Sequence, residues 1–248
     1  ESMNKNYISI NSDALANEVV NIFEDRDLVS APVVDKNNIL LGRITIDDVV
    51  DVIREESESA VLNMAGLTDE EDIFAPVLPS ARRRAIWLGL NLITALIASG
   101  VISLFQDTIE RVVALAVLMP IVASMGGIAG SQTLTLVIRG IALGNISSAN
   151  SKSLLIKELL VGLLNSLLWA CVIGVLSSYW FDNYLIGVVI GIAMVANLVF
   201  AALSGVLIPI IFKKIGMDPA LGGGVILTTI TDVIGFFSFL ALGTFFLL

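Results

Sequence analysis

The sequence predicts a mainly α-helical protein with a five-helix polytopic membrane domain, preceded by a small α+β segment and an acidic connecting helix. Apolar residues make up 56% of its 248 residues, and the mean hydropathy of +0.90 is far above that of soluble domains. Charge is divided unevenly. Residues 1–75 hold 17 of the 23 acidic residues and 5 of the 14 basic ones, so an acidic soluble segment precedes a weakly basic apolar one.

The first segment, residues 1–55, alternates short β-like runs with helical ones. Residues 7–10 form a possible short strand, and Ser12-Asp13 can cap a helix that follows. Residues 31–34 and 39–45 read as strands joined by a hairpin turn at 35–38. Thr45 can cap a second helix. These elements predict a small α+β domain that is marginally stable alone at this size.

Residues 56–80 are predicted to be an acidic connecting helix and linker. A solvated helix face is the ordinary explanation of such a run of charge. The acids around and within this segment are Glu55, Glu56, Glu58, Asp69, Glu70, Glu71 and Asp72.

Residues 81–248 contain the five spans, at about 85–105, 112–138, 154–180, 185–212 and 221–248. Each is near the ~20 residues that cross a bilayer as a helix, or longer. Basic residues concentrate on the cytoplasmic side of membrane proteins. With five helices, all but Arg111 of the basic residues here share one face, so we expect a cytoplasmic N-terminus and an external C-terminus. That face holds Arg82, Arg83, Arg84, Arg139, Lys152, Lys157, Lys213 and Lys214.

Composition also limits the chemistry. The chain has no histidine and one cysteine, which effectively excludes Zn and Fe–S sites. A bound metal must therefore use oxygen ligands, which favours hard ions such as Mg²⁺ or Ca²⁺. The acidic first segment argues against nucleic acid, because phosphate contacts need a basic face, and it suits attraction of cations.

Asp232 lies in the middle of the last apolar run. An ionised group there costs about 3 kcal/mol on insertion scales, so such residues usually line a wet cavity or pair with another group. Thr228, Asp232 and Gly235 follow helical spacing, and Thr229 is also a neighbour of the acid. A hydroxyl-bearing stripe around a carboxylate indicates a hydrated cation path. The alternative is an Asp that only packs helices.

A second polar and glycine-rich region runs from Met119 to Thr133. Pro120 removes a helix hydrogen bond, and the glycines permit either close backbone approach or an unwound stretch with free carbonyls. Small-residue helix packing is the alternative. A third region, 217–224, contains Asp218, which can cap a helix beginning at Pro219. The secondary candidates for lining the path are Thr228, Thr229, Gly126, Gly127, Gly130 and Gln132.

These motifs together resemble the MgtE family of magnesium channels and transporters. The resemblance covers nearly the whole chain and is carried by residues 80–88, 91–92, 119–132, 217–220 and 228–232. Residues 7–55 resemble the second CBS domain of that family, with Ala-Pro-Val-Val-Asp at 31–35 and Leu-Gly-Arg-Ile-Thr-Ile-Asp-Asp at 41–48.

The resemblance implies a homodimer in a bacterial plasma membrane, with Mg²⁺ as the ion, a pore between protomers and a plug helix that closes it. Family members carry an N-terminal domain and a first CBS domain that this sequence lacks, so a nucleotide would need an intact CBS pair. The acids expected to bind regulatory Mg²⁺ are Asp48, Asp51, Glu55 and Glu56. One departure is Ile128, where the family usually has Asn.

Two further classes of membrane protein compete with a pore. A proton-coupled secondary transporter of divalent cations could use Asp232 as its proton carrier, and an intramembrane Asp suits either mechanism. An intramembrane enzyme has no support, because no Ser/His, Cys/His or paired-acid motif falls within the spans. The sequence therefore predicts a transport protein and not an enzyme.

Overall fold

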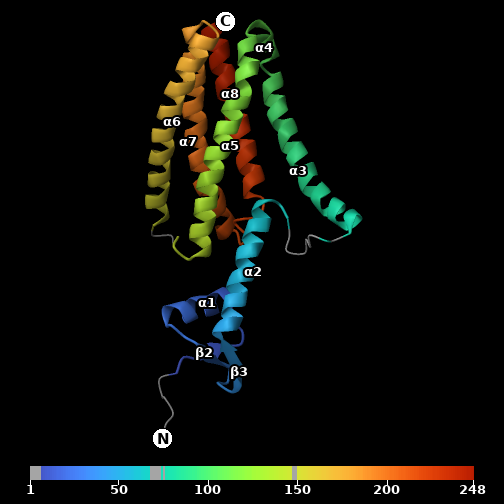
Figure 1. Cartoon of the computed structure of the whole chain (residues 1–248), viewed down its shortest axis with the longest axis vertical. Helices are drawn as coiled ribbons and strands as arrows, with labels where there is room; N and C mark the ends of the chain where they lie inside the picture. The colour runs from blue at the N-terminus through green and yellow to red at the C-terminus, as the bar shows by residue number, and fades with distance from the viewer. Residues whose placement is uncertain (1–6, 68–73, 75, 147–149) are drawn as a thin grey trace. The chain divides into compact units, whose positions relative to one another are not determined.

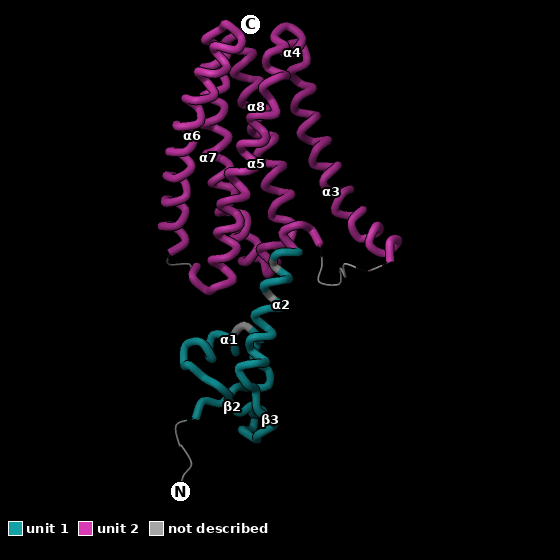
Figure 2. Tube along the Cα trace, viewed as in Figure 1, with its two compact units in different colours: residues 1–62 teal, residues 63–248 magenta. Residues whose placement is uncertain are grey.

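The computed structural model describes residues 7–67, 74, 76–146 and 150–248, apart from the side chains of Asn17, Glu56 and Ala60. The chain forms two compact units, Glu1–Leu62 and Asn63–Leu248 (Figure 2). The predicted acids Asp69, Glu70, Glu71 and Asp72 lie outside the described residues.

Unit 1 contains a three-stranded sheet in the order β1-β2-β3 (Figure 1). Strand β1 (Ile10–Asn11) pairs in parallel with β2 (Ser30–Val34), which pairs antiparallel with β3 (Leu40–Thr45). Helix α1 (Ala16–Asp25) and the start of α2 (Ile46–Met64) complete the unit. The small core that excludes water consists of Ile10, Val19, Phe23, Ala31 and Val49.

The two predicted helix caps had different outcomes. Helix α1 begins at Ala16 with no side-chain cap, so the cap expected from Ser12-Asp13 is wrong. Residues 11–13 form a turn before the helix, in which Asn11 Oδ1 accepts a hydrogen bond from the Asp13 amide at 3.0 Å. At α2, the Asp48 carboxylate accepts from both the amide and the hydroxyl of Thr45, each at 2.9 Å. This is the reciprocal half of a capping box.

Helix α2 is continuous from Ile46 to Met64. The boundary placed at residues 55 and 56 between the α+β domain and the connecting helix therefore falls inside one helix, and the boundary between the compact units follows Leu62. No proline or glycine interrupts residues 46–64, which explains why the helix does not break there.

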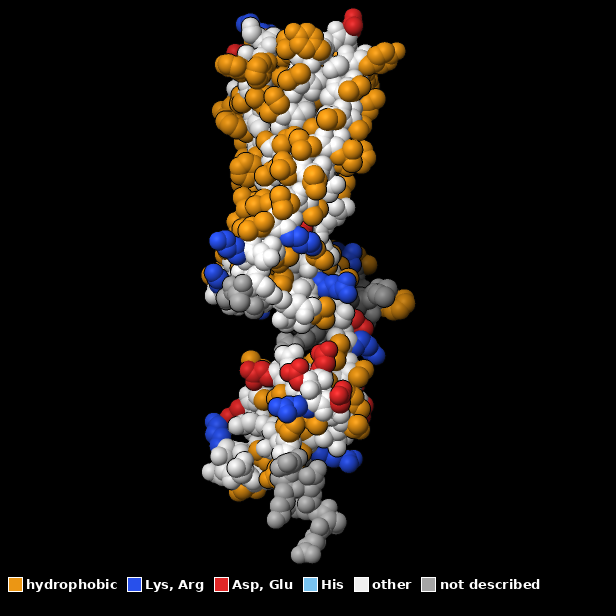
Figure 3. All heavy atoms as spheres, turned by 90° about the vertical axis from the view of Figure 1, so that its left-hand side faces the viewer, with side chains coloured by type: hydrophobic (Ala, Val, Ile, Leu, Met, Phe, Trp, Pro, Cys, Tyr) orange, Lys and Arg blue, Asp and Glu red, His pale blue; other side chains and the backbone are white. Residues whose placement is uncertain are grey.

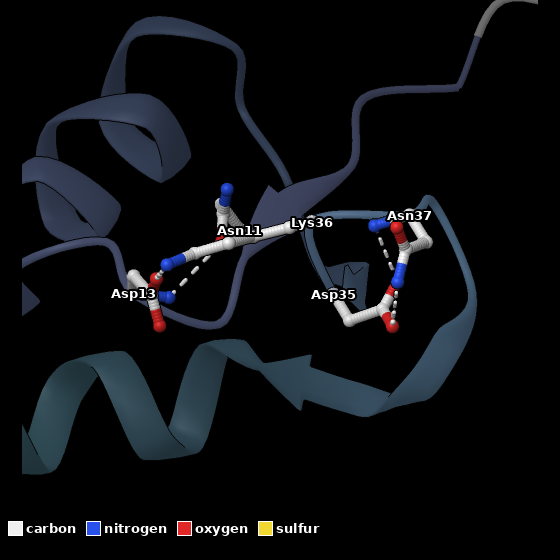
Figure 4. A network of polar contacts seen from close by, with 5 residues as sticks. All are labelled: Asn11, Asp13, Asp35, Lys36 and Asn37. Carbon is white, nitrogen blue, oxygen red and sulfur yellow. Dashed lines mark hydrogen bonds and ion pairs between the residues drawn. The ribbon is translucent and has the colours of Figure 1, made fainter.

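The hairpin between β2 and β3 is confirmed, and Asp35 organises its turn (Figure 4). Its Oδ1 accepts hydrogen bonds from the amides of Ile39 at 2.7 Å and Asn37 at 2.8 Å. Asn38 takes a positive φ of 60°, which Asn tolerates better than most residues. The bond from Ile39, and then that from Asn37, hold the pKa of the Asp35 carboxyl below its usual value.

A pH-dependent contribution to stability follows. A carboxyl with a depressed pKa stabilises the folded state above its unfolded pKa of about 3.9, and the contribution is lost as the pH falls through the folded value. We expect Asp35→Ala to lower the hydrogen-exchange protection of the Ile39 amide severalfold at neutral pH, with the difference shrinking below pH 4. The exposed Asp25→Ala is the matched control. Equal protection in the Asp35 variant would contradict this role.

The described part of unit 2 contains five long apolar helices and one short one, besides the end of α2. The long helices are α3 (Val77–Ser103), α5 (Val113–Ala142), α6 (Ser151–Trp180), α7 (Tyr184–Lys214) and α8 (Gly223–Leu247), and all five have the length and composition to span a bilayer. The short helix α4 (Gln106–Arg111) joins α3 to α5. Hydrophobic side chains cover the visible face of this unit, and Lys and Arg side chains gather where that apolar surface ends (Figure 3). The predicted five-helix membrane class is confirmed.

Helix α7 is the centre of the bundle and packs against α5, α6 and α8 (Figure 1). One core cluster joins α5, α7 and α8 through residues such as Leu118, Ile190 and Phe239. Helix α3 lies at the outside, where Ala98 is its buried residue and α8 its main neighbour. The remaining surface of α3 is exposed and largely apolar, so it is suited to contact with lipid or with another protein chain.

The chain before α8 differs from expectation. The helix begins at Gly223, after Gly222 in the left-handed region with φ 72°, and so the predicted helix start at Pro219 is wrong. Asp218 instead closes a turn, since its Oδ1 accepts from the Ala220 amide at 2.8 Å. Its Oδ2 accepts from Asn63 Nδ2 at 2.9 Å. The left-handed Gly222 separates this turn from the helix.

Candidate functional site

Helix α8 presents a buried stripe to the other helices at a spacing of four residues, formed by Gly223, Leu227, Thr231, Gly235, Phe239 and Gly243. Thr228 and Asp232 each follow a member of that stripe, so they lie about 100° around the helix from it. Thr228 is exposed and Asp232 is partly buried. Gly235 belongs to the buried stripe, contrary to its expected place beside Thr228 and Asp232.

The Asp232 carboxylate forms no hydrogen bond or ion pair with any described residue. A helix-packing Asp would bond to a neighbouring hydroxyl or amide, as buried polar groups normally do. The carboxylate is partly exposed, so a cation or water can reach it. This geometry favours the cation-path interpretation over the packing one.

The threonines before Asp232 have their hydroxyl protons committed. Thr228 Oγ1 donates to the Gly224 carbonyl at 2.9 Å, and Thr229 Oγ1 donates to the Val225 carbonyl at 2.7 Å. Each hydroxyl oxygen then has only lone pairs to offer. Water bound to a dication donates its protons outward, so such oxygens are oriented acceptors for a hydrated ion.

Of the alternatives left open for the stretch near Pro120, the unwound one does not occur, because α5 is a continuous helix from Val113 to Ala142. Pro120 removes only one backbone bond, and packing against α7 and α8 holds the helix around it. Two glycines permit close approach instead. A Cβ on Gly126 would overlap the Asn197 side chain, and one on Gly130 would lie 2.8 Å from Leu227. Both glycines therefore serve helix packing in this unit.

The remaining α5 candidates face outward. A Cβ added to Gly127 would meet nothing within 4 Å, and Ser131 and Gln132 are exposed. Ile128 is 56% exposed. These positions share one face of α5, and a contribution to an ion path from Gly127 and Gln132 stays a prediction.

Ile128 gives a direct test of that face. We expect Ile128→Asn to fold and to raise Mg²⁺ flux severalfold or shift selectivity against Ca²⁺, because an exposed amide adds an oxygen that can contact a hydrated ion. Ion uptake into proteoliposomes measures both effects, with Leu164→Asn, exposed on α6, as a control. Unchanged flux and selectivity would remove position 128 from the path. Loss of folding would mean that apolar groups bury the position in the assembled protein.

A polar cavity of about 220 Å³ opens beside Thr228 within unit 2. Its wall comes from the end of α2, from α3, from α5 and from the start of α8. Sequence reasoning did not assign its amides and indole to a site, although the apolar run of α3 visibly contains Trp87 and Asn91. The polar and aromatic lining residues are Asn63, Trp87, Asn91, Ser131 and Thr228.

The regulatory acids are not gathered by the structure. Asp48 is committed to the cap of α2, whereas Asp51 and Glu55 are exposed and the Glu56 side chain lies outside the described part. Among the described residues, no group of three or more His, Cys, Asp or Glu side chains could hold a metal ion. A regulatory Mg²⁺ site at these four acids stays a prediction.

Two buried residues with a charged or amide side chain, Glu158 and Asn197, were not among the predicted candidates. Glu158 on α6 is 5% exposed, pairs with Lys157 Nζ at 2.9 Å and accepts a hydrogen bond from Thr133 Oγ1 at 3.4 Å. Asn197 is fully buried in α7. A charged or amide residue inside an apolar run was the available signal for both.

Comparison with known proteins identifies the relatives of this chain. A sequence profile of the MgtE family, described as a divalent cation transporter, matches residues 119–242, and a CBS domain profile matches residues 1–55. Three curated relatives carry the name magnesium transporter MgtE. The protein from Bacillus subtilis is 32% identical over 240 residues, covering 96% of this chain and 53% of the relative.

The relative from Enterococcus faecalis is 31% identical over 231 residues, covering 93% of this chain and 51% of its own length. The one from Thermus thermophilus is 30% identical over 243 residues, covering 97% and 54%. The chain thus spans about half the length of these relatives. Its five spans define a multi-pass membrane protein with a CBS domain. It belongs to the MgtE family.

Proposed function

We propose that this chain transports Mg²⁺ across a bacterial plasma membrane through a pore formed by two copies. The observation that carries the proposal is the Asp232 carboxylate, partly buried within a spanning helix and without a partner among the described residues. An ionised group in that position is expensive unless it meets water or a cation. The relatives' printed name, magnesium transporter, supports the choice of ion.

The side chains near Asp232 suit a hydrated dication. Mg²⁺ dehydrates reluctantly and keeps several waters, so a site can hold it through those waters. Asp232 supplies negative charge, while Thr228 and Thr229 offer oxygens whose protons are already used within the helix. Outer-sphere contact of this kind needs several acceptors around the ion, and the polar cavity that Thr228 lines holds further oxygens, on Asn91 and Ser131.

A second copy completes the path in this proposal. Asp232 and Thr228 of α8 are partly or fully exposed within one chain, as are Ile128 and Gln132 of α5, so two copies facing each other would enclose the carboxylates. Two close carboxylates repel, and an occupying dication stabilises both in the ionised form. An inside-negative potential contributes about 4.6 kcal/mol per 100 mV for a dication, from ~2.3 per charge. A passive pore needs no further energy source.

The proposed orientation places the N-terminus in the cytoplasm, because the basic residues other than Arg111 lie on one side of the five spans. Cytoplasmic Mg²⁺ acting on unit 1 would gate the pore. The competing mechanism is a transporter in which Asp232 exchanges a proton for the metal.

Uptake of Mg²⁺ into proteoliposomes tests the proposal and separates it from proton coupling. An imposed inside-negative potential should drive uptake without a pH gradient, and a pH gradient alone should not. Uptake that needs the pH gradient would favour the proton-coupled alternative. Absence of uptake under both conditions would reject Mg²⁺ transport by this chain.

A further inference from the structure

The central helix of unit 2 carries one fully buried amide, Asn197, in an apolar stretch between Ala193 and Ala201. Its Nδ2 donates a hydrogen bond to the Val122 carbonyl of α5 at 2.8 Å. A carbonyl oxygen can only accept, so the nitrogen must face α5. The Oδ1 atom is buried and has no partner among the described residues.

The amide lies between two glycines of different helices. A methyl group on Gly126 of α5 would be 2.8 Å from Asn197 Cγ, and one on Gly235 of α8 would be 2.7 Å from Asn197 Nδ2. Real Cβ atoms essentially never approach so closely. Asn197 therefore occupies the space that the absence of side chains at Gly126 and Gly235 creates, and it contacts α5 and α8 together.

Stability alone does not explain an amide here. An unpaired buried acceptor lowers stability, and an apolar side chain of similar size would fill the same space without leaving one. The position of Asn197 matters because it contacts α5 and α8, the two helices that carry the candidate path residues. Helix α8 carries Asp232 three residues before Gly235, and α5 carries the half-buried candidate Gly127 and the exposed Ile128 directly after Gly126.

We propose that Asn197 is a positioning residue that sets the spacing and rotation of α5 and α8, and thereby the discrimination of Mg²⁺ from the larger Ca²⁺. This inference rests on the proposed function. The hydrogen bond to Val122 fixes the level of α5, while the close fit against Gly235 fixes the rotation of α8 and the direction of Asp232. Loss of the amide loosens both, so the path no longer matches the rigid octahedral hydrate of Mg²⁺, and Ca²⁺, whose coordination geometry is more adaptable, passes as well.

The test uses the full chain in proteoliposomes and compares Mg²⁺ with Ca²⁺ uptake. We expect Asn197→Ala to lower the ratio of Mg²⁺ to Ca²⁺ uptake at least about threefold, and Asn197→Asp, which keeps the shape but loses the donor, to lower it as well. The matched control is Ser166→Ala. Ser166 is also fully buried, but its hydroxyl donates only within its own helix, to the Leu163 carbonyl at 2.8 Å, so the ratio should not change.

A double variant separates positioning from simple packing. Gly126→Ala alone should lower the melting temperature because its methyl displaces the amide, whereas in the Asn197→Ala background the methyl enters vacated space and should restore it. The uptake ratio should stay low in that double variant. An uptake ratio equal to that of the unsubstituted protein in Asn197→Ala would overturn the inference while leaving the proposed function standing. Absence of all uptake in the unsubstituted protein would reject the proposed function, and the selectivity role with it.

Discussion

Asp232→Asn is expected to reduce Mg²⁺ uptake into proteoliposomes at least about tenfold while the protein still folds. The amide keeps the volume of the side chain and removes its charge. At an effective dielectric constant of about 20, a unit charge about 5 Å from a dication contributes on the order of 6 kcal/mol before desolvation is counted. If the variant lost only a quarter of that stabilisation, ion occupancy would still fall about tenfold.

The control for this variant is Asp107→Asn. Asp107 is an exposed acid of the short helix α4, which is not one of the five spans. Its substitution changes the net charge of the chain by the same amount but outside the spanning helices. Uptake should remain near that of the unsubstituted protein. Near-normal uptake in Asp232→Asn, with this control unchanged, would refute the assignment of Asp232 as the pore acid.

Gly205→Ala is expected to lower the unfolding free energy by about 1–3 kcal/mol, the usual range for overpacking a close interior contact. A Cβ at Gly205 of α7 would lie 2.9 Å from the Gly130 carbonyl oxygen and 2.9 Å from Thr133 Cβ, both on α5. Backbone atoms cannot move aside as the end of a side chain can, so the two helices must separate. Thermal unfolding in detergent measures the loss.

Gly100→Ala provides a control of opposite sign. Gly100 lies in α3 with nothing within 4 Å of its Cβ position, and alanine in a helix interior is favoured over glycine by roughly 0.5–1 kcal/mol. This variant should be neutral or slightly stabilised. Equal changes in the two variants would show that the α5–α7 crossing does not depend on the missing side chain of Gly205.

Hydrophobic length was enough to predict the membrane class. Each of the five runs exceeds the span of a bilayer, and few other structures accommodate so much apolar surface. The β2–β3 hairpin was also predictable, because Asp35 and Asn38 are residues with a local preference for turns. Helix starts were less predictable. Before α1 the Asn11 side chain closes a turn by accepting from the Asp13 amide, before α8 Asp218 closes a turn, and neither Asp caps the helix that follows.

The interior of the bundle could not be read from the sequence. Pro120 and three glycines are compatible with an unwound stretch or with tight packing, and the choice depends on which side chains of α7 and α8 fill the space. Leu227 and Asn197 fill it here, so α5 stays helical. The structural roles of Asn197 and Glu158 were equally unpredictable, because the role of a buried polar residue depends on partners that lie far away in the sequence.

The current that Mg²⁺ carries across a planar bilayer tests the central claim, a passive cation path at Asp232, most directly. With unequal Mg²⁺ on the two sides and equal pH, the reversal potential should follow the Mg²⁺ gradient. Adding a pH gradient should leave it unchanged, and Asp232→Asn should abolish the current. A reversal potential that shifts with the pH gradient, or a current that persists in Asp232→Asn, would contradict the account.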